Sequence, residues 1–157
     1  MRKPLLVALC LLVLGMTAMA QNKIETKWHC AKATTEHKID VGDEAGHNYS
    51  IAQGTCNATA SAKGFAEKSG MYTEFLENRQ ASSTNHGRFT VAMDNGDKVF
   101  YAYEGMVPSD KKATNRWRIE SGTGKQKGIK GAGTCTGTMN QDGSSDWTCT
   151  GTYSMAK

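Results

Sequence analysis

Beyond residue 20 the chain alternates between short segments that mix apolar and polar residues and clusters of turn residues. No stretch of three helical turns carries apolar residues on a 3.6-residue period, and Leu76 is the only leucine in this part. The segments are rich in Thr, Tyr, Phe, Val and Trp, which favour strands. We expect strands at Ile24–Thr34, His47–Ser61, Phe65–Asn78, Gly87–Met93, Lys98–Gly105, Thr114–Ser121, Gly128–Asn140 and Ser144–Met155.

About eight strands, with a turn between most of them and no long crossover, predict an all-β protein built as an antiparallel up-and-down β-barrel. The turn Asp94–Asp97 has Asn-Gly at its centre, the signal of a two-residue hairpin loop, and this loop would set Val91 opposite Phe100. The turn Gln141–Gly143 fits a three-residue loop with glycine in the left-handed conformation.

The register set by the two-residue loop decides which residues of the first hairpin share a face. One face is apolar and contains Phe89, Val91, Met93, Phe100 and Ala102. The other is mixed and contains Arg88, Thr90, Ala92, Val99, Tyr101 and Tyr103. A barrel of eight strands holds side chains or one small ligand. The pattern favours the apolar face inside and hence a packed core, but a mixed face inside would line a cavity with polar groups.

The N-terminal segment has a composition of its own, with two basic residues followed by an apolar run from Leu5 to Met16. Small residues at Ala18 and Ala20 complete a cleavage site, so Met1–Ala20 is predicted to be a secretory signal peptide and residues 21–157 a single domain. Secretion, in a bacterium to the periplasm, follows from this. No later segment is apolar enough to span a membrane, so we expect no integral membrane association.

Charge and motifs exclude several function classes. Without Arg2 and Lys3, 17 basic residues face 15 acidic ones, and a net charge of +2 is too small to indicate nucleic-acid binding. Zinc requires closely spaced ligand pairs, which His29, Cys30, His37 and His47 do not form, so neither a metal nor another cofactor is expected. No serine-nucleophile motif is present. The sequence does not indicate an oligomeric state.

Four cysteines remain after the signal peptide, and an even number in an exported chain indicates two disulfides. The three-residue loop at Gln141–Gly143 sets Cys135 directly opposite Cys149, at a spacing that a disulfide can bridge. Cys30 and Cys56 then pair by elimination, and they lie symmetrically about a turn-like segment at Val41–Gly46.

The segment from Gly122 to Thr134 reads G-T-G-K-Q-K-G-I-K-G-A-G-T. It lacks the spacing of a phosphate-binding loop, and its glycines are expected to form a corner that leads into the last hairpin. The segment resembles the G-T-G-K-aromatic-x-G-I-x-G-x-G-T segment of allene oxide cyclase-like barrels, with Gln126 in place of the aromatic. These belong to the calycin-like group, and Asn95–Tyr101 resembles its bacterial secreted members of unknown function. The resemblance implies an eight-stranded barrel with a central cavity and transfers no catalytic residue.

A ligand inside such a barrel would meet aromatic and polar side chains together. The candidate ligand-binding residues are Tyr72, Glu74, Arg88, Tyr101, Tyr103 and Trp117. A buried Glu74 could act as an acid or base, although a solvated place on a strand face is the simpler expectation for it. The three tryptophans are expected to fill the barrel ends more than to stack on a ligand.

Three functions remain open. The favoured one is a secreted barrel that binds a small apolar or amphipathic ligand. The second is an isomerase or cyclase that would need Glu74, Arg88 or Tyr103 inside a cavity; without a catalytic motif, binding is favoured over catalysis. The third is an envelope interaction or inhibitor protein that acts through exposed loops such as Gln80–His86 or Pro108–Lys112.

Overall fold

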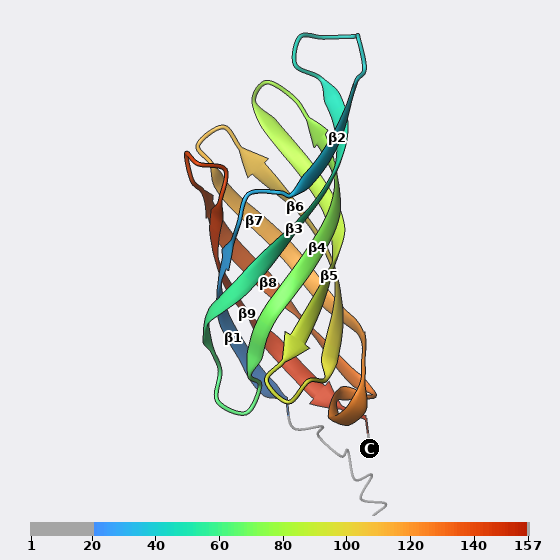
Figure 1. Ribbon diagram of the computed structural model, residues 1–157, viewed down its shortest axis with the longest axis vertical. Helices are drawn as coiled ribbons and strands as arrows, with labels where there is room; N and C mark the ends of the chain where they lie inside the picture. The colour runs from blue at the N-terminus through green and yellow to red at the C-terminus, as the bar shows by residue number, and fades with distance from the viewer. Residues whose placement is uncertain (1–20, 157) are drawn as a thin grey trace, which may run out of the picture.

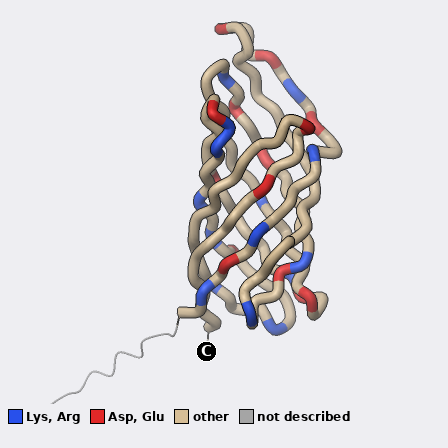
Figure 2. The backbone as a smooth tube through the Cα atoms, turned by 90° about the vertical axis from the view of Figure 1, so that its left-hand side faces the viewer, with Lys and Arg blue, Asp and Glu red and all other residues tan. Residues whose placement is uncertain are grey.

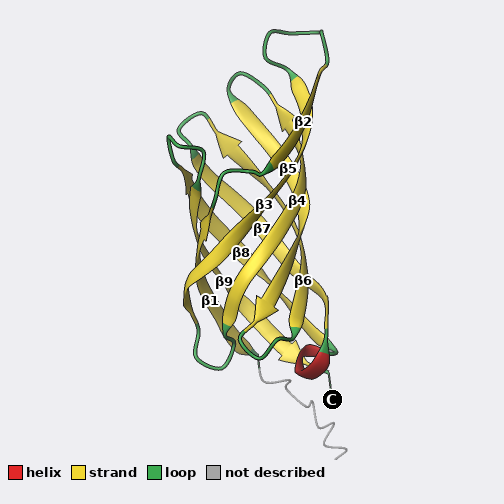
Figure 3. Cartoon of the chain, in the orientation of Figure 1, coloured by secondary structure: helices red, strands yellow, loops and turns green. Residues whose placement is uncertain are grey.

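The computed structural model of the protein describes residues 21–156 and consists almost entirely of β-strands (Figures 1 and 3). The predicted signal peptide, residues 1–20, lies outside the described residues. The elements in chain order are β1 (Asn22–Cys30), β2 (Thr35–Asp40), β3 (Asn48–Ser61), β4 (Glu67–Asn78), β5 (Ser82–Met93), β6 (Lys98–Pro108), β7 (Lys112–Gly122), the short 3-10 helix η1 (Gly124–Gln126), β8 (Ile129–Met139) and β9 (Ser145–Met155).

Eight strands close into an antiparallel barrel, which confirms the predicted fold class. Neighbours along the chain pair from β3 to β9, and β1 pairs with both β9 and β3, so that the sheet meets itself. The one strand outside this barrel, β2, pairs with the first half of β3. It extends past the barrel rim together with the β2–β3 loop (Figure 1). We call the rim beside this strand the β2 end and the opposite rim, beside the short helix, the η1 end.

Two strand boundaries differ most from the predicted ones because the pattern there is weak. The first strand ends at Cys30, and the chain then starts the separate strand β2, whose six side chains are all exposed and which the sequence did not indicate. The fifth strand begins at Ser82, so the predicted loop Gln80–His86 is largely strand. Neither segment has a row of apolar side chains facing the core. The alternation of apolar and polar residues that identifies a strand in a sequence is therefore absent from both.

The hairpin between β5 and β6 has a three-residue loop, and the predicted two-residue loop is wrong. Met93 N–H donates to Asp97 O at 2.9 Å, and Gly96 N–H donates to Met93 O at 3.0 Å. Gly96 has a φ of +85°, the left-handed conformation that this loop type requires. Val91 therefore lies opposite Val99, one residue away from the expected register.

This shift reverses the face of one strand relative to the other, because side chains alternate with a period of two. The barrel interior takes the apolar face of β5 together with the mixed face of β6. Neither of the two expected faces is therefore found intact inside. The inward-facing residues of the hairpin include Phe89, Val91, Met93, Val99, Tyr101 and Tyr103.

The η1 end of the interior is a packed core. Phe65 from the β3–β4 turn covers this end, and its ring lies 4.6 Å from that of Tyr153. Val91, Val99 and Ile129 beneath it are completely buried. Each such side chain contributes about 1.5–3 kcal/mol by leaving water, so this end provides much of the stability of the barrel.

Both predicted disulfides are present. Cys30–Cys56 joins β1 to β3 where the barrel closes, and Cys135–Cys149 joins the last two strands. The second pair lies in direct register, as the loop at Gln141–Gly143 predicted, with Asn140 N–H donating to Ser144 O at 2.8 Å.

The glycine-rich segment has two roles, and the expected single corner covers only the first of them. Gly124 and Gly128 have positive φ and turn the chain around η1. Gly133 lies inside β8 and faces Gly151 across the sheet, and a Cβ at either position would collide with the ring of Trp117. The strand glycines thus make room for a tryptophan inside the barrel, a close approach that only glycine allows.

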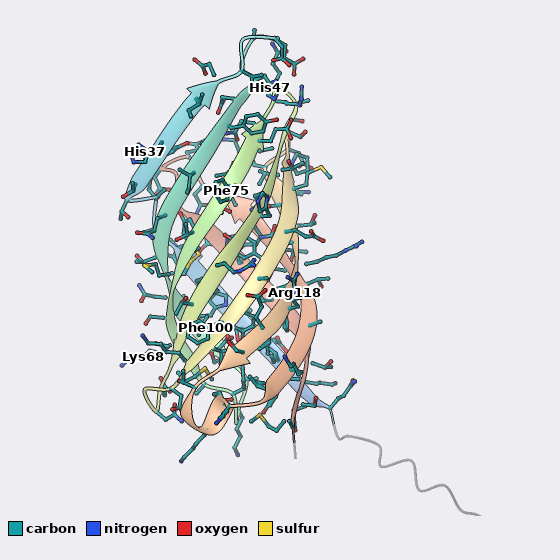
Figure 4. All side chains as sticks on the ribbon, turned by 90° about the vertical axis from the view of Figure 1, so that its right-hand side faces the viewer. His37, His47, Lys68, Phe75, Phe100 and Arg118 are labelled. Atoms are coloured by element: carbon teal, nitrogen blue, oxygen red, sulfur yellow. A yellow bond between two sulfur atoms is a disulfide. The ribbon has the colours of Figure 1, made fainter. Side chains whose placement is uncertain are left out.

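Basic and acidic positions are interspersed along the backbone of the barrel (Figure 2). Figure 4 shows Arg118, Phe75 and His37 on the outside of the barrel. Within the described part of the chain, no helical segment has the length and apolarity needed to cross a membrane.

Candidate functional site

The interior towards the β2 end contains a cavity of about 370 Å³. It reaches from Ile24 and Glu67, next to the packed core, to Lys32 and Ser145 near the rim. The wall is mainly apolar and aromatic and includes both disulfides. Such a volume lies within the range of small-molecule sites, about 300–1,000 Å³.

Five of the six predicted ligand-binding residues line this cavity. They are Tyr72, Glu74, Tyr101, Tyr103 and Trp117. Trp28 and Trp147 line the cavity as well. All three tryptophans therefore belong to the cavity wall, whereas they were expected to fill the barrel ends.

The sixth candidate, Arg88, lies outside the barrel, and its prediction as a cavity residue is wrong. Its side chain is 62% exposed, and its Nε lies 3.1 Å from Glu120 Oε2. Arg88 and Arg118 flank Ala102, which is buried although it faces outward. The placement follows from the hairpin register, because Arg88 alternates with Phe89, which points inward.

A buried carboxyl group, Glu67, lies at the inner end of the cavity. Tyr101 OH donates a hydrogen bond to its Oε1 at 2.7 Å, and Thr26 Oγ1 donates to its Oε2. Burial raises the pKa of this carboxyl, and the two hydrogen bonds oppose that effect. The pKa of Tyr101 is likewise raised, first by burial and then by the neighbouring Glu67. This cluster has its hydrogen bonds satisfied within the protein.

A second carboxyl group, Glu74, lies in the wall of the cavity on β4. Its Oε2 accepts hydrogen bonds from Asn85 Nδ2 at 2.8 Å and from Tyr103 OH at 3.0 Å. Burial is the main cause that raises the pKa of Glu74. Burial and the nearby Glu74 also raise the pKa of Tyr103, and they raise that of Tyr72 to about 12. At neutral pH both tyrosines therefore keep their protons, and Tyr103 OH donates to Glu74 Oε2.

Sequence reasoning missed several polar cavity residues, among them Glu67, Asn85 and Asn115. Glu67 follows the β3–β4 turn and shows no alternation that would turn it inward. Asn85 shares its inward face with Phe89 and Val91, so extending the strand backwards from these apolar residues would have found it. Asn115 stands two residues before Trp117, on the same face of β7.

Of the rejected metal candidates, Cys30 is in a disulfide and His29 and His47 have carboxylate partners. His47 is buried, with Nδ1 2.6 Å from Asp43 Oδ1 and Nε2 3.2 Å from Glu77 Oε1. His29 Nδ1 lies 2.8 Å from an oxygen of Asp146 on the outer surface. Figure 4 shows His37 and His47 near the β2 end.

The fold and the cavity define the chain as a disulfide-bonded, eight-stranded antiparallel β-barrel with an internal cavity. No model of a known protein family matches the chain, and no curated protein matches it.

Replacing Glu67 with glutamine tests the ionisation of the buried carboxyl. Because the pKa of Glu67 is raised on folding, the folded protein retains a proton that the unfolded chain loses above its pKa of 4.5. This proton's contribution to the free energy of unfolding is complete below pH 4.5 and is lost as pH rises through the folded pKa. E67Q cannot ionise, so its free energy of unfolding relative to that of the wild type should increase from pH 4 to pH 8.

Urea unfolding of both proteins at pH 4, 6 and 8 measures this difference. Glu25→Gln, on the exposed face of β1, removes a solvated carboxyl and serves as the control, with no such trend expected. A constant difference between E67Q and the wild type across this range would show that Glu67 ionises normally.

Proposed function

We propose that the protein binds a small apolar or amphipathic ligand inside the barrel and that it does so outside the cytoplasm, in the bacterial periplasm. The observation that carries this proposal is the internal cavity, whose aromatic and apolar wall carries a few polar groups. Ligand sites generally combine these features, the apolar wall supplying affinity and the polar groups fixing orientation.

Two further features support the location. The segment Met1–Ala20 has the pattern of a signal peptide. Both disulfides require an oxidising compartment to form and persist, and such compartments lie outside the cytoplasm.

The resemblance of Gly122–Thr134 to allene oxide cyclase-like barrels supports the same function. Barrels of that group have eight strands around a central cavity, and this protein has that architecture. Of the three residues that an isomerase could use, Glu74 and Tyr103 line the cavity and Arg88 lies outside it, so catalysis stays the alternative to ligand binding.

Narrowing the cavity from within tests the proposal. Leu76 lines the cavity, whereas its neighbour Phe75 is 54% exposed on the outer face. Leu76→Trp adds a ring to the interior and should weaken binding of the neutral fluorophore N-phenyl-1-naphthylamine at least tenfold. Phe75→Trp adds similar bulk outside and should leave binding unchanged. Titration of the fluorophore emission measures both dissociation constants.

Native mass spectrometry of protein purified from its own host adds an independent measurement. We expect a bound small molecule on the wild type and less of it on Leu76→Trp. Equal fluorophore affinity in Leu76→Trp and the wild type would place binding outside the barrel and contradict the proposal.

A further inference from the structure

The η1 end of the barrel carries an unbalanced set of lysines. Around this rim lie the start of β1, the turns β3–β4, β5–β6 and β7–β8, and the strand ends beside them (Figure 1). Within these segments the acidic residues are Asp94, Asp97 and the buried Glu67. The lysines, which we call the basic rim, number seven: Lys23, Lys63, Lys68, Lys98, Lys125, Lys127 and Lys130.

The charges of the basic rim are not neutralised by the protein. All seven lysines are exposed, and within residues 21–156 none of them takes part in an ion pair. The carboxylate of Asp97 accepts hydrogen bonds from Lys125 N–H at 3.0 Å and from Asn95 Nδ2 at 2.8 Å. Like charges on one rim repel each other, and this repulsion disfavours the compact state. A partner that supplies negative charge would remove this cost.

The β2 end is different, because its charged side chains neutralise one another. Arg79 pairs with Glu44 and Glu77, and His47 lies between Asp43 and Glu77. Residues 21–157 have a net charge of only +2, so outside the basic rim acidic residues are in excess. The fold therefore separates charge along the barrel axis, and the sequence does not show this because the lysines are spread from residue 23 to residue 130.

The arrangement of the basic rim fits a planar partner. Its lysines come from several turns around an end that Phe65 closes, and several blue segments lie at this lower end in Figure 2. Figure 4 shows Lys68 on the outside of the barrel near the same end. Lysine is a hydrated point charge on a flexible stem and lacks the rigid fork with which arginine recognises a single phosphate. Such a ring suits diffuse negative charge spread over a surface.

The other exposed side chains of this end favour a membrane surface over nucleic acid. Single-stranded nucleic acid is usually bound along a basic groove with aromatic side chains on which the bases stack. Among the described residues, the large exposed hydrophobic side chains, such as Tyr49 and Phe75, all lie outside the basic rim. The same observation indicates a contact that stays at the level of the lipid head groups, because the rim has no apolar side chain to insert.

We propose that the basic rim binds the surface of an anionic phospholipid bilayer as a peripheral, electrostatic contact. A lysine near such a surface contributes about fivefold in affinity, or about 1 kcal/mol. The inference goes beyond the proposed function and does not depend on it. The cavity lies towards the opposite end, so a barrel that stands on its basic rim keeps the cavity away from the membrane.

Cosedimentation with unilamellar vesicles tests the inference. Vesicles of phosphatidylcholine alone are compared with vesicles of equal parts phosphatidylcholine and phosphatidylglycerol, at pH 7 and at about 0.05 M and about 0.5 M NaCl. At the higher salt concentration electrostatic attraction is screened within a few ångströms. We expect the wild-type protein to bind the anionic vesicles at low salt, to leave them at high salt and not to bind the neutral vesicles.

A triple variant locates the contact. Lys63, Lys125 and Lys127 lie in turns, and replacing all three with glutamine should weaken binding to the anionic vesicles about 100-fold. The matched control replaces Lys38, Lys112 and Arg116 with glutamine, which removes the same charge from exposed positions outside the basic rim. The control should bind within about threefold of the wild type. Circular dichroism verifies that both variants are folded.

Three results would overturn the inference. The first is equal binding of the wild type to neutral and anionic vesicles, or no binding to either at low salt. The second is equal loss of affinity in the two triple variants, which would show that net charge and not the basic rim determines binding. The third is tighter binding of the wild type to a DNA oligonucleotide than to the anionic vesicles, which would identify the rim as a nucleic-acid site.

Discussion

Replacing Trp117 with alanine is expected to lower the free energy of unfolding by about 3–5 kcal/mol, the usual cost of removing a large aromatic side chain from a core. The Trp117 ring is 7% exposed and lies edge-on to Tyr101, with 5.5 Å between the ring centroids. It also rests on Gly133 and Gly151. The two glycines beneath the ring have no side chain that could move in to fill the space left by its removal.

Phe75→Ala is the matched control, since it truncates an exposed aromatic residue that stacks on His86. We expect a loss below about 1 kcal/mol there, as for most surface substitutions. Urea unfolding followed by circular dichroism gives both values. A loss at Trp117 no larger than the loss at Phe75 would contradict the described packing of the interior.

Removing the disulfide at the barrel closure has the second large effect. Replacing both Cys30 and Cys56 with alanine removes a crosslink between residues that are 26 positions apart in the sequence. The Cys135–Cys149 crosslink joins residues that are 14 positions apart. The loop-entropy relation gives losses of about 3.5 and about 3 kcal/mol for the two pairs. The first loss corresponds to a fall in Tm of roughly 10 °C for a domain of this size.

The position of the Cys30–Cys56 disulfide should make the difference in stability between the two double variants larger. Cys30 and Cys56 bridge β1 and β3, the pair that closes the sheet, while the other disulfide joins strands already linked by a short loop. Differential scanning calorimetry of the two double variants measures the order. A larger loss for the Cys135–Cys149 variant would show that chain entropy and barrel closure do not determine these stabilities.

The candidate site was only partly predictable, and one turn accounts for the error. The Asn-Gly dipeptide indicated a two-residue loop, but Asp94–Gly96 form a three-residue loop with Gly96 left-handed. The difference of one residue separated Arg88, which lies on the surface, from Tyr101 and Tyr103, which line the cavity. Tyr101 and Tyr103 stayed inside because their own strand kept its mixed face inward.

The remaining site residues depend on contacts distant in sequence. Glu67 is buried because Thr26 and Tyr101 meet it from strands β1 and β6. Asn85 and Asn115 lie at the same level of the barrel because each pairs with Gly105 on β6. No local pattern carries such information, since each partner lies on another strand.

The sequence by itself determined the all-β class, the approximate strands and both disulfide pairs. These properties follow from local composition, from the spacing of turns and from the small number of possible cysteine pairings. Only the tertiary structure decided that β1 closes the barrel through β3 and β9, which hairpin faces point inward, and that one end is packed while the other is hollow. The physical reason is that strand alternation has a period of two, so a single residue of register, set by pairing with other strands, exchanges inside for outside.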